Sequence, residues 1–441
     1  MNFMKIDVIS MGCSKNLIDS ERLLKRISDK GHTFSHNPEI PSGDYVVVNT
    51  CGFIADAKEE SINLILRLGE MKKRGEIGKI VVMGCLSERY KNEIEELIPE
   101  VDIWYGKFDW KHFIDNLPDE GINTSETADY KRELTTPPHH AFIKISEGCN
   151  RFCAFCAIPI ITGRHKSRAE EEIISEVEEL TAKGVKEFNI IAQDLSSYGT
   201  DLYGEHRLAH LVDRISRIPG VEWIRLHYAY PADFPEDILD VMASRPNVCA
   251  YLDIALQHIS DTVLTNMRRH FNKEKTLALI QKIRQKVPGI AIRTTLMVGF
   301  PGEGEKEFEE LLDFVRETKF ERLGAFSYSE EDDTWAAKNL KDEIPETVKR
   351  QRLEKLLDLH EKLSLERNKS LIGSRIRVIV DEIEEGTAIC RSEHDSPDVD
   401  YSISVPLPEQ TDESRKIKCG DFIYVEITDA LPFELAAELV S

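Results

Sequence analysis

Short β-branched runs alternate with helical segments along most of this chain, and that alternation constrains its fold more than any other feature. In the first 110 residues the runs "IDVIS", "YVVVN" and "IVVMG" are each followed by a stretch with helical apolar spacing. Strands that alternate with helices in this way pack as a parallel sheet with crossover helices. The chain is therefore predicted to be of the α/β class and to begin with a parallel α/β domain.

The alternation resumes over residues 141–329, where six strand candidates are separated by helical stretches. Six strand–helix units in succession predict an open or partial (βα)6 barrel of the TIM type. The six strand candidates are "AFIKIS", "EFNIIA", "WIRLHYAY", "AYLDIAL", "AIRTTLMVGF" and "RLGAFSYS".

Two segments indicate the domain limits. Residues 116–140 form a polar linker with turn formers, charges and a Pro-Pro pair. Residues 346–373 have helical spacing and many charges, and the short strand-like runs that follow are typical of a small β-barrel. We therefore expect three domains, at residues 1–125, 137–368 and 371–441.

Composition places the chain among ordinary globular proteins, with 41% hydrophobic and 31% charged residues. Its first residues lack a signal-peptide pattern, and no window approaches the run of about 20 apolar residues that a membrane span needs. We expect a cytoplasmic protein without a membrane partner. In that reducing compartment, clustered cysteines are better interpreted as metal ligands or reactive thiols than as disulfides.

The sharpest motif opens the middle domain as "EGCNRFCAFCAIP", with Cys149, Cys153 and Cys156. Three thiolates on one tight loop can bind three irons of a cubane cluster and leave the fourth iron open. A structural zinc site normally closes with a fourth ligand, and ferredoxin-type runs supply a fourth cysteine. The spacing therefore favours a redox-active iron–sulfur cluster over zinc or chance.

A second group of cysteines stands where the first three strand candidates end: Cys13, Cys51 and Cys85. Ligands of parallel sheets bind beyond the carboxyl ends of the strands, so these thiols are expected to converge. Each cysteine alone is more often a buried, apolar-like residue. Together, however, the three predict a second cluster with one open iron. The remaining three, Cys249, Cys390 and Cys419, have no metal spacing and are expected to be packing residues.

The C-x-x-x-C-x-x-C motif at the end of the first barrel strand, with Phe155 before its last cysteine, resembles the radical S-adenosylmethionine (SAM) superfamily. That resemblance implies that SAM binds the open iron and is cleaved to a 5'-deoxyadenosyl radical that abstracts hydrogen. A three-cysteine domain before it and a TRAM β-barrel after it resemble the methylthiotransferase family over essentially the whole chain. The implied cofactors are two 4Fe-4S clusters and SAM, which serves as radical source and as methyl donor.

Within that family, four stretches are similar to the RimO branch: "MGCSKNLIDSE", "NTCGFIADAKEESI", "GCLSERY" and "YLDIALQHIS". This branch is implied to insert a methylthio group at the β-carbon of an aspartate of small-subunit ribosomal protein S-twelve. The alternative branch modifies isopentenyladenosine in transfer RNA and usually has a Gln-Met-Asn type sequence after the first cysteine. Ser14, Ala255 and Asp333 depart from the branch pattern, without touching the cluster ligands.

Charge gives an independent indication of the substrate. The formal net charge of the chain is −22, and residues 372–441 hold 6 basic and 16 acidic residues. A module that binds transfer RNA should be basic, whereas an acidic one suits a basic ribosomal protein. We therefore expect no strong transfer RNA binding, although a merely solvated acidic face is the simpler alternative.

Other roles follow from the resemblance alone. It implies that Phe155, Gln193, Asp194, Gln257 and Arg293 contact SAM, with Gln193 and Asp194 near its amino group and Arg293 near its carboxylate; a plain polar loop explains some of them equally well. The implied partners are the ribosomal protein, free or in the subunit, an electron donor such as flavodoxin or ferredoxin, and a sulfur source. A non-enzymatic alternative is an iron–sulfur electron carrier or sensor.

Overall fold

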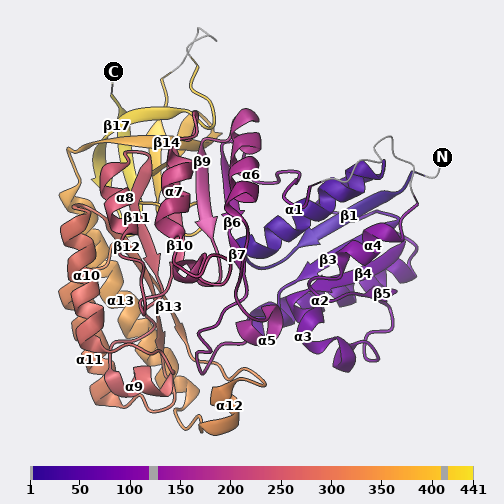
Figure 1. Cartoon of the computed structure of the whole chain (residues 1–441), viewed down its shortest axis with the longest axis horizontal. Helices are drawn as coiled ribbons and strands as arrows, with labels where there is room; N and C mark the ends of the chain where they lie inside the picture. Colours follow the sequence, from indigo (N-terminus) through magenta and orange to yellow (C-terminus); the bar gives the residue numbers. More distant parts are fainter. Residues whose placement is uncertain (1–2, 119–127, 409–415, 441) are drawn as a thin grey trace.

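The computed structural model describes residues 3–118, 128–408 and 416–440, which form three units (Figure 1). The N-terminal unit is a parallel sheet with the strand order β2-β1-β3-β4-β5. Helices cover both of its faces. Its elements are β1 (Lys5–Ser10), α1 (Ser14–Asp29), β2 (Thr33–His36), β3 (Tyr45–Thr50), α2 (Ala55–Lys73), β4 (Lys79–Gly84), α3 (Cys85–Ile94), β5 (Ile103–Trp104) and α4 (Trp110–Asp115).

Two apolar layers hold this unit together. On one face of the sheet, α1 and α4 bury Leu23, Leu24 and Phe113 against Val8. The opposite face packs α2 through side chains that include Leu68. The parallel α/β prediction is confirmed, but the short edge strands β2 and β5 lack an apolar run and were not predicted.

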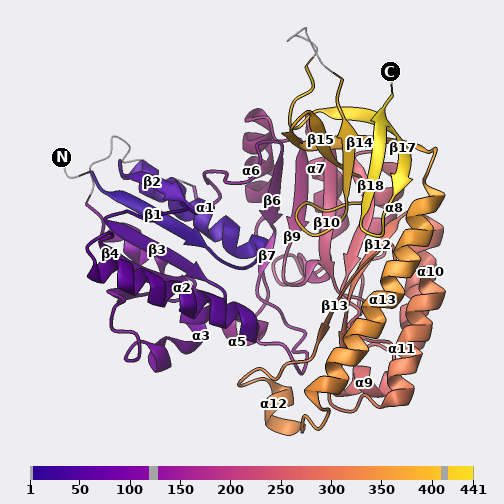
Figure 2. The ribbon, with the colours of Figure 1, turned by 180° about the vertical axis from the view of Figure 1, so that it is seen from behind.

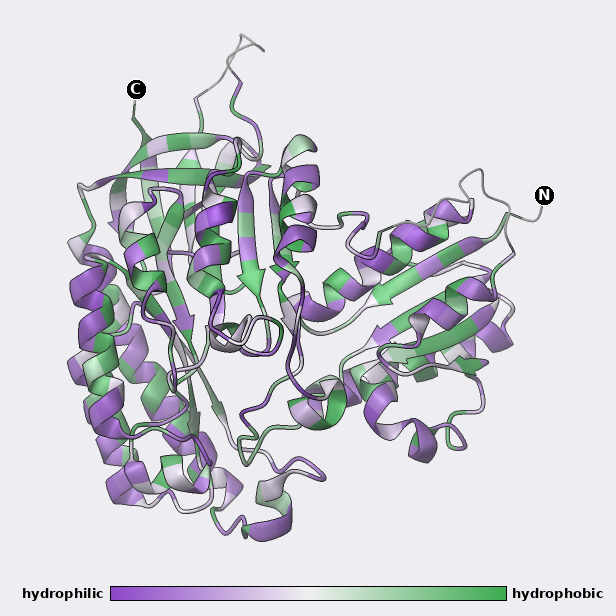
Figure 3. Cartoon of the chain, viewed as in Figure 1, coloured by the Kyte–Doolittle hydropathy of each residue, from purple (hydrophilic) through white to green (hydrophobic). Residues whose placement is uncertain are grey.

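The central unit is a six-stranded parallel sheet with the order β13-β12-β11-β10-β9-β6, so the predicted open barrel of six strands is confirmed. The strands are mostly hydrophobic, whereas the outer helices carry both hydrophobic and hydrophilic residues (Figure 3) and contribute apolar side chains to the core. The strands are β6 (His140–Lys144), β9 (Glu187–Ile191), β10 (Trp223–Ala229), β11 (Val248–Ile254), β12 (Ala291–Val298) and β13 (Arg322–Ser327).

Helices pack outside this open barrel, and shorter elements lie in its loops (Figure 2). The helices are α6 (Glu170–Ala182), α7 (Leu208–Ser216), α8 (Ile238–Ser244), α9 (Asp261–Asn266), α10 (Lys273–Lys286), α11 (Glu305–Thr318) and α13 (Glu346–Ser370). The loop elements are β7 (Ser146–Glu147), α5 (Ile158–Thr162), β8 (Lys166–Ser167), η1 (Leu195–Ser197) and α12 (Trp335–Asn339).

The C-terminal unit is a closed barrel with the order β14-β15-β16-β18-β17, which confirms the predicted small β-barrel. Its strands are β14 (Arg375–Glu384), β15 (Thr387–Ser392), β16 (Ser402–Pro406), β17 (Phe422–Ala430) and β18 (Glu434–Leu439). α13 ends at Ser370 and β14 begins at Arg375, and the second domain limit, at residues 368–371, stays a prediction. The first limit, at residue 125, lies outside the described residues.

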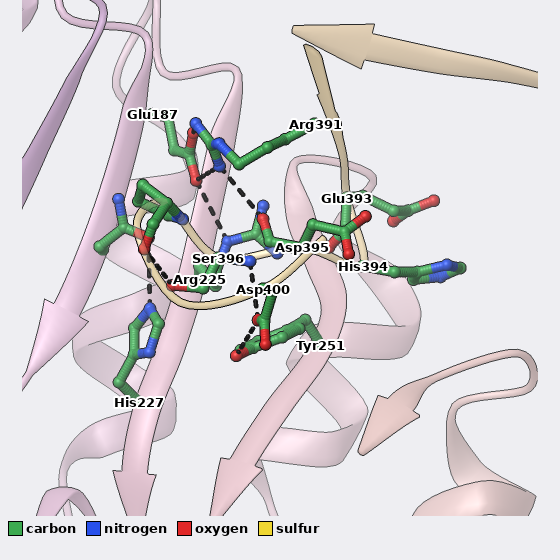
Figure 4. Close-up of polar contacts among 12 residues, drawn as sticks. Glu187, Arg225, His227, Tyr251, Arg391, Glu393, His394, Asp395, Ser396 and Asp400 are labelled. Carbon is green, nitrogen blue, oxygen red and sulfur yellow. Dashed lines mark hydrogen bonds and ion pairs between the residues drawn. The ribbon is translucent and has the colours of Figure 1, made fainter. Parts of the chain in front are cut away.

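A buried polar network joins the C-terminal barrel to the starting ends of the central strands (Figure 4). Arg391 on β15 binds Glu187, the first residue of β9, at 2.7 Å, and Arg225 on β10 binds the same carboxylate at 3.1 Å. From the loop after β15, Asp400 accepts a hydrogen bond of 2.8 Å from the Tyr251 hydroxyl. The barrel therefore closes the end of the central unit opposite to the carboxyl ends of its strands.

Among the described helices, none is both long and apolar enough to cross a membrane.

Candidate functional site

Three of the cysteines lie at the carboxyl edge of the N-terminal sheet. Cys13 precedes α1, Cys51 follows β3, and Cys85 opens α3 directly after β4. Because β1, β3 and β4 are parallel neighbours, their ends bring the three loops to one edge, which faces the central unit in Figures 1 and 2. Gly12, at φ +85°, makes the approach possible, since a Cβ there would lie 2.8 Å from the Cβ of Cys51.

The other three cysteines lie on the loop between β7 and α5 of the central unit, Cys149, Cys153 and Cys156. The loop is tight: the Cys156 amide donates to the Cys153 carbonyl at 3.1 Å. It begins at Gly148, with φ +79°, where a Cβ would lie 2.2 Å from the backbone oxygen of Arg164, between α5 and β8. Only glycine fits there, so the backbone itself sets the direction in which the thiols point.

All six cysteines line one cavity of about 340 Å³ between the two units. No three histidine, cysteine or carboxylate side chains among the described residues are grouped to hold a single metal ion. Acidic side chains are absent from the described residues of the cavity wall, while cationic ones are present. The wall residues other than cysteines are Lys15, Asn16, Phe53, Lys107, Arg151, Phe155, Ile158, Ile161, Thr162, Gln193, Tyr228, Ala229, Tyr230, Ala255, Gln257 and Arg269.

The protein environment treats the thiols unequally. Burial raises the pKa of Cys85 and of Cys149 to about 12, and it raises the pKa of Cys51 and Cys156 as well. At Cys13 burial also acts upward, but nearby lysines and backbone amides outweigh it, so that its pKa is lowered. Most of these thiols are therefore protonated until a metal displaces the proton.

Lys107 is a buried cation beside the N-terminal cysteines that sequence reasoning did not identify. Its ammonium contacts Asp19 at 2.7 Å and donates to the Asn16 side-chain oxygen at 3.3 Å. The Cys85 thiol donates to that same oxygen at 3.5 Å. Lys107 follows β5, a two-residue strand without an apolar run, so no motif marks its position.

Arg269 has a corresponding place beside the central cysteines. Its guanidinium donates to the Cys153 sulfur at 3.3 Å and to the Ala255 carbonyl, and it lies 4.3 Å from the centre of the Tyr230 ring. The Tyr230 hydroxyl donates back to the Arg269 carbonyl at 2.8 Å. This buried pair places a positive charge on the cysteine loop, and sequence spacing did not predict it.

Of the residues that the resemblance assigned to SAM, Phe155, Gln193 and Gln257 lie in the cavity wall. Gln193 donates to Glu147, while the side-chain oxygens of Gln193 and Gln257 are buried without a partner in the described residues. Gln257 also has φ +71°, an uncommon conformation for a residue with a side chain. Two unpaired acceptors in one wall suit a ligand that carries hydrogen-bond donors.

The other two assigned residues lie outside the wall. Asp194 binds Arg151, which is a wall residue, at 2.7 Å. Arg293 lies on β12, where it contacts Asp253 at 3.4 Å and Asp400 of the C-terminal loop at 3.3 Å. The structure thus brings six cysteines and three of these five residues together.

The donor set fits two iron–sulfur clusters and a small polar cofactor. Each cysteine group supplies three thiols from glycine-bounded loops, and the unpaired oxygens of Gln193 and Gln257 face the same wall. Three thiols leave one iron of a cubane cluster free for another ligand.

Three family descriptions match successive parts of the chain: Uncharacterized protein family UPF0004 at residues 5–106, the Radical SAM superfamily at residues 143–315, and the TRAM domain at residues 372–440. "Ribosomal protein uS12 methylthiotransferase RimO" of Porphyromonas gingivalis is 54% identical over 436 residues, 99% of each chain. The protein of the same name from Bacteroides thetaiotaomicron is 52% identical over 99% of this chain and 98% of its own.

Solved structures share the fold at low identity. The radical SAM methyltransferase TsrM from Kitasatospora setae superposes with a TM-score of 0.54 at 16% identity, covering 74% of this chain and 75% of its own. The cobalamin-dependent radical enzyme OxsB gives a TM-score of 0.52 at 13% identity, covering 82% of this chain and 56% of its own. These likenesses bear on the fold alone.

Proposed function

The chain belongs to the RimO family of radical SAM methylthiotransferases, and on that premise we propose that it inserts a methylthio group at the β-carbon of an aspartate of ribosomal protein uS12. The observation that carries the proposal is the single cavity whose wall holds both cysteine groups. A substrate side chain that enters this cavity lies within reach of both. Such joint positioning is what a reaction between two separately held groups requires.

The family's cofactors are two 4Fe-4S clusters and SAM, and when bound they supply the electron, the hydrogen abstraction, the sulfur and the methyl group. We assign Cys149, Cys153 and Cys156 to the cluster that takes SAM, and the N-terminal cysteines Cys13, Cys51 and Cys85 to the cluster that takes part in sulfur transfer. The protein's own contribution is to hold the two clusters apart and at a fixed position relative to each other.

Some of the remaining wall residues position the cofactor, and others exclude water. Phe155, Gln193 and Gln257 are the proposed SAM contacts, with the two free amide oxygens as acceptors. Asp194 is a positioning residue for Arg151, and Arg293 is one for Asp253, which accepts a hydrogen bond from the Tyr228 amide. Apolar wall residues such as Ile158 limit access of water to reactive species.

Surface charge supports a basic protein substrate, although only part of the acidic charge of the C-terminal barrel is exposed. Some acids of the C-terminal barrel are neutralised at the domain contact: Asp395 binds Arg322 at 2.9 Å. Glu382, Glu384 and Glu385 in contrast are exposed around the β14–β15 turn. An exposed acidic turn favours encounter with a basic partner and opposes binding to phosphates.

The test is mass spectrometry of products from reconstituted, reduced enzyme incubated with SAM, sulfide and, in parallel, uS12 and isopentenylated transfer RNA. We expect one methylthio group on an aspartate of uS12 and none on the RNA. Methylthiolation of adenosine would instead favour the alternative substrate. Stable cluster absorption without SAM turnover would favour an electron carrier.

The remaining expectations belong to the same proposal. An electron donor such as flavodoxin or ferredoxin reduces the enzyme, a sulfur source replenishes the N-terminal site, and the protein works in the cytoplasm, where its substrate is made. The domain limits remain proposed at residues 1–125, 137–368 and 371–441.

A further inference from the structure

The cavity wall holds four cationic side chains, and three of them have fixed partners. Lys107 forms an ion pair of 2.7 Å with Asp19. Arg151 forms one of 2.7 Å with Asp194. Arg269 donates hydrogen bonds to the Cys153 sulfur and to the Ala255 carbonyl. Lys15 differs from them. Within the described residues its ammonium has neither an ion pair nor a hydrogen bond, and its contact is the face of the Tyr228 ring, 3.3 Å from the ring centre.

Tyr228 is held firmly under this ammonium. Its backbone has φ +63°, which is uncommon for an aromatic residue, and its amide donates to Asp253 at 3.3 Å. Asp253 in turn contacts Arg293 at 3.4 Å, so this carboxylate already has partners. The tyrosine therefore fixes the position of Lys15 through a cation–π contact and leaves its donors free.

We propose that Lys15 binds the side-chain carboxylate of the substrate aspartate. This inference rests on the proposed function and names the residue that recognises its substrate. The carboxylate of aspartate is one bond from the β-carbon, so a group that holds the carboxylate also orients the carbon that reacts. Lys15 lies two residues after Cys13, which places it at the sulfur-donating side of the cavity.

The chemistry of the wall supports this role. A carboxylate that leaves water for a partly enclosed site needs a charged partner. Lys15 is half-buried, and among the cations of the described wall it is the one whose charged group has neither an ion pair nor a hydrogen bond. A lysine provides three donors on a flexible stem, which suits a substrate side chain that arrives from a separate protein.

The test combines an enzyme variant with a substrate variant. Wild-type enzyme and Lys15→Met, each loaded with both clusters, are assayed on uS12 and on uS12 with its target aspartate replaced by asparagine. For wild type we expect asparagine to raise KM about 10- to 100-fold, the value of a charge-assisted hydrogen bond. In Lys15→Met the KM values for the two substrates should be nearly equal, and Lys15→Arg should restore part of the difference between them.

Separate readouts identify other causes. SAM cleavage without uS12 and the electron paramagnetic resonance of both clusters should be unchanged in Lys15→Met, and the matched surface variant Lys73→Met should behave as wild type. Equal loss on both substrates, or an altered N-terminal cluster signal, would overturn the proposal and give Lys15 a role at Cys13. If wild-type enzyme fails to modify uS12 at all, the proposed function itself is wrong.

Discussion

Substitution of a single cysteine should have a different effect in each of the two cysteine groups. Cys153→Ala removes one thiol of the group assigned to SAM, so it should abolish formation of 5'-deoxyadenosine. Cys51→Ala leaves that group whole and should keep most of the cleavage while losing methylthio transfer. Chromatography with mass spectrometry of both products checks this. Methylthiolated uS12 from Cys51→Ala would contradict the sulfur-transfer role.

Sequence spacing was sufficient to propose the six cysteine ligands because each group is visible locally, as a short motif or as a repeated strand end. Lys107 and Arg269 could not be found that way. Each reaches its cysteine group from a distant segment, across 22 residues from Cys85 and 116 from Cys153. Arg293, which the resemblance assigned to SAM, lies outside the cavity wall and pairs with Asp253 and Asp400, so its contact with SAM stays a prediction.

At the scale of the element, long apolar strands were predictable and short ones were not. β3, β9 and β12 each contain an apolar run that indicates a buried strand, so their limits agree with the sequence prediction within a few residues. β7 and β8 pair with each other over two residues and exist because the cysteine loop must return on itself. Such elements depend on tertiary contacts rather than on local pattern.

The junction between β9 and β15 should be the most sensitive contact of the C-terminal barrel. Glu187 is fully buried between Arg225 and Arg391, and these arginines hold its pKa well below the usual range. Glu187→Gln leaves the buried Arg225 without its anionic partner and Arg391 with Asp381 alone, at a cost of about 3–5 kcal/mol. We expect the apparent melting temperature to fall by about 5–10 °C in calorimetry.

The control for that junction is Arg375→Met, which breaks a surface pair with Glu426 on the same barrel. Exposed pairs contribute little, so its melting temperature should match that of wild type. Equal melting temperatures for Glu187→Gln and wild type would show that the buried network does not hold the barrel.

The contact between α13 and the C-terminal barrel should make stability depend on pH. Burial, with a contribution from Arg322, lowers the pKa of His360 to about 4. The folded state thus keeps the ring neutral while the unfolded chain takes up a proton below about 6.5, and stability is lost as pH falls from about 6.5 toward 4. His360→Gln should reduce the drop in melting temperature between pH 7 and pH 5. An unchanged drop would mean that other groups, such as buried His140, carry the effect.

For the molecule as a whole, a chain of charges beside the cavity contributes to the relation between the two cysteine groups. Asp19 on α1 binds Lys107 at 2.7 Å and Lys144 on β6 at 2.5 Å, and Lys144 also binds Glu147 at 2.8 Å. The lysines hold the pKa of Asp19 well below its usual range against burial. No pattern in the sequence could predict this contact, because its members come from three separate segments and two domains.

Asp19→Asn should therefore uncouple the two halves of the reaction. Each cysteine group keeps its own thiols, so SAM cleavage should persist, but two buried lysines lose their shared partner and the N-terminal unit loses its register with the central one. A misplacement on the order of 1 Å can cost about 100-fold. We expect the ratio of methylthiolated uS12 to 5'-deoxyadenosine to fall about 10- to 100-fold. Asp129→Asn, which breaks an exposed pair with Lys111, is the control and should keep the wild-type ratio. If Asp19→Asn also keeps that ratio, the other contacts between the units, such as the buried Arg89–Glu331 pair, are sufficient to hold the cavity together.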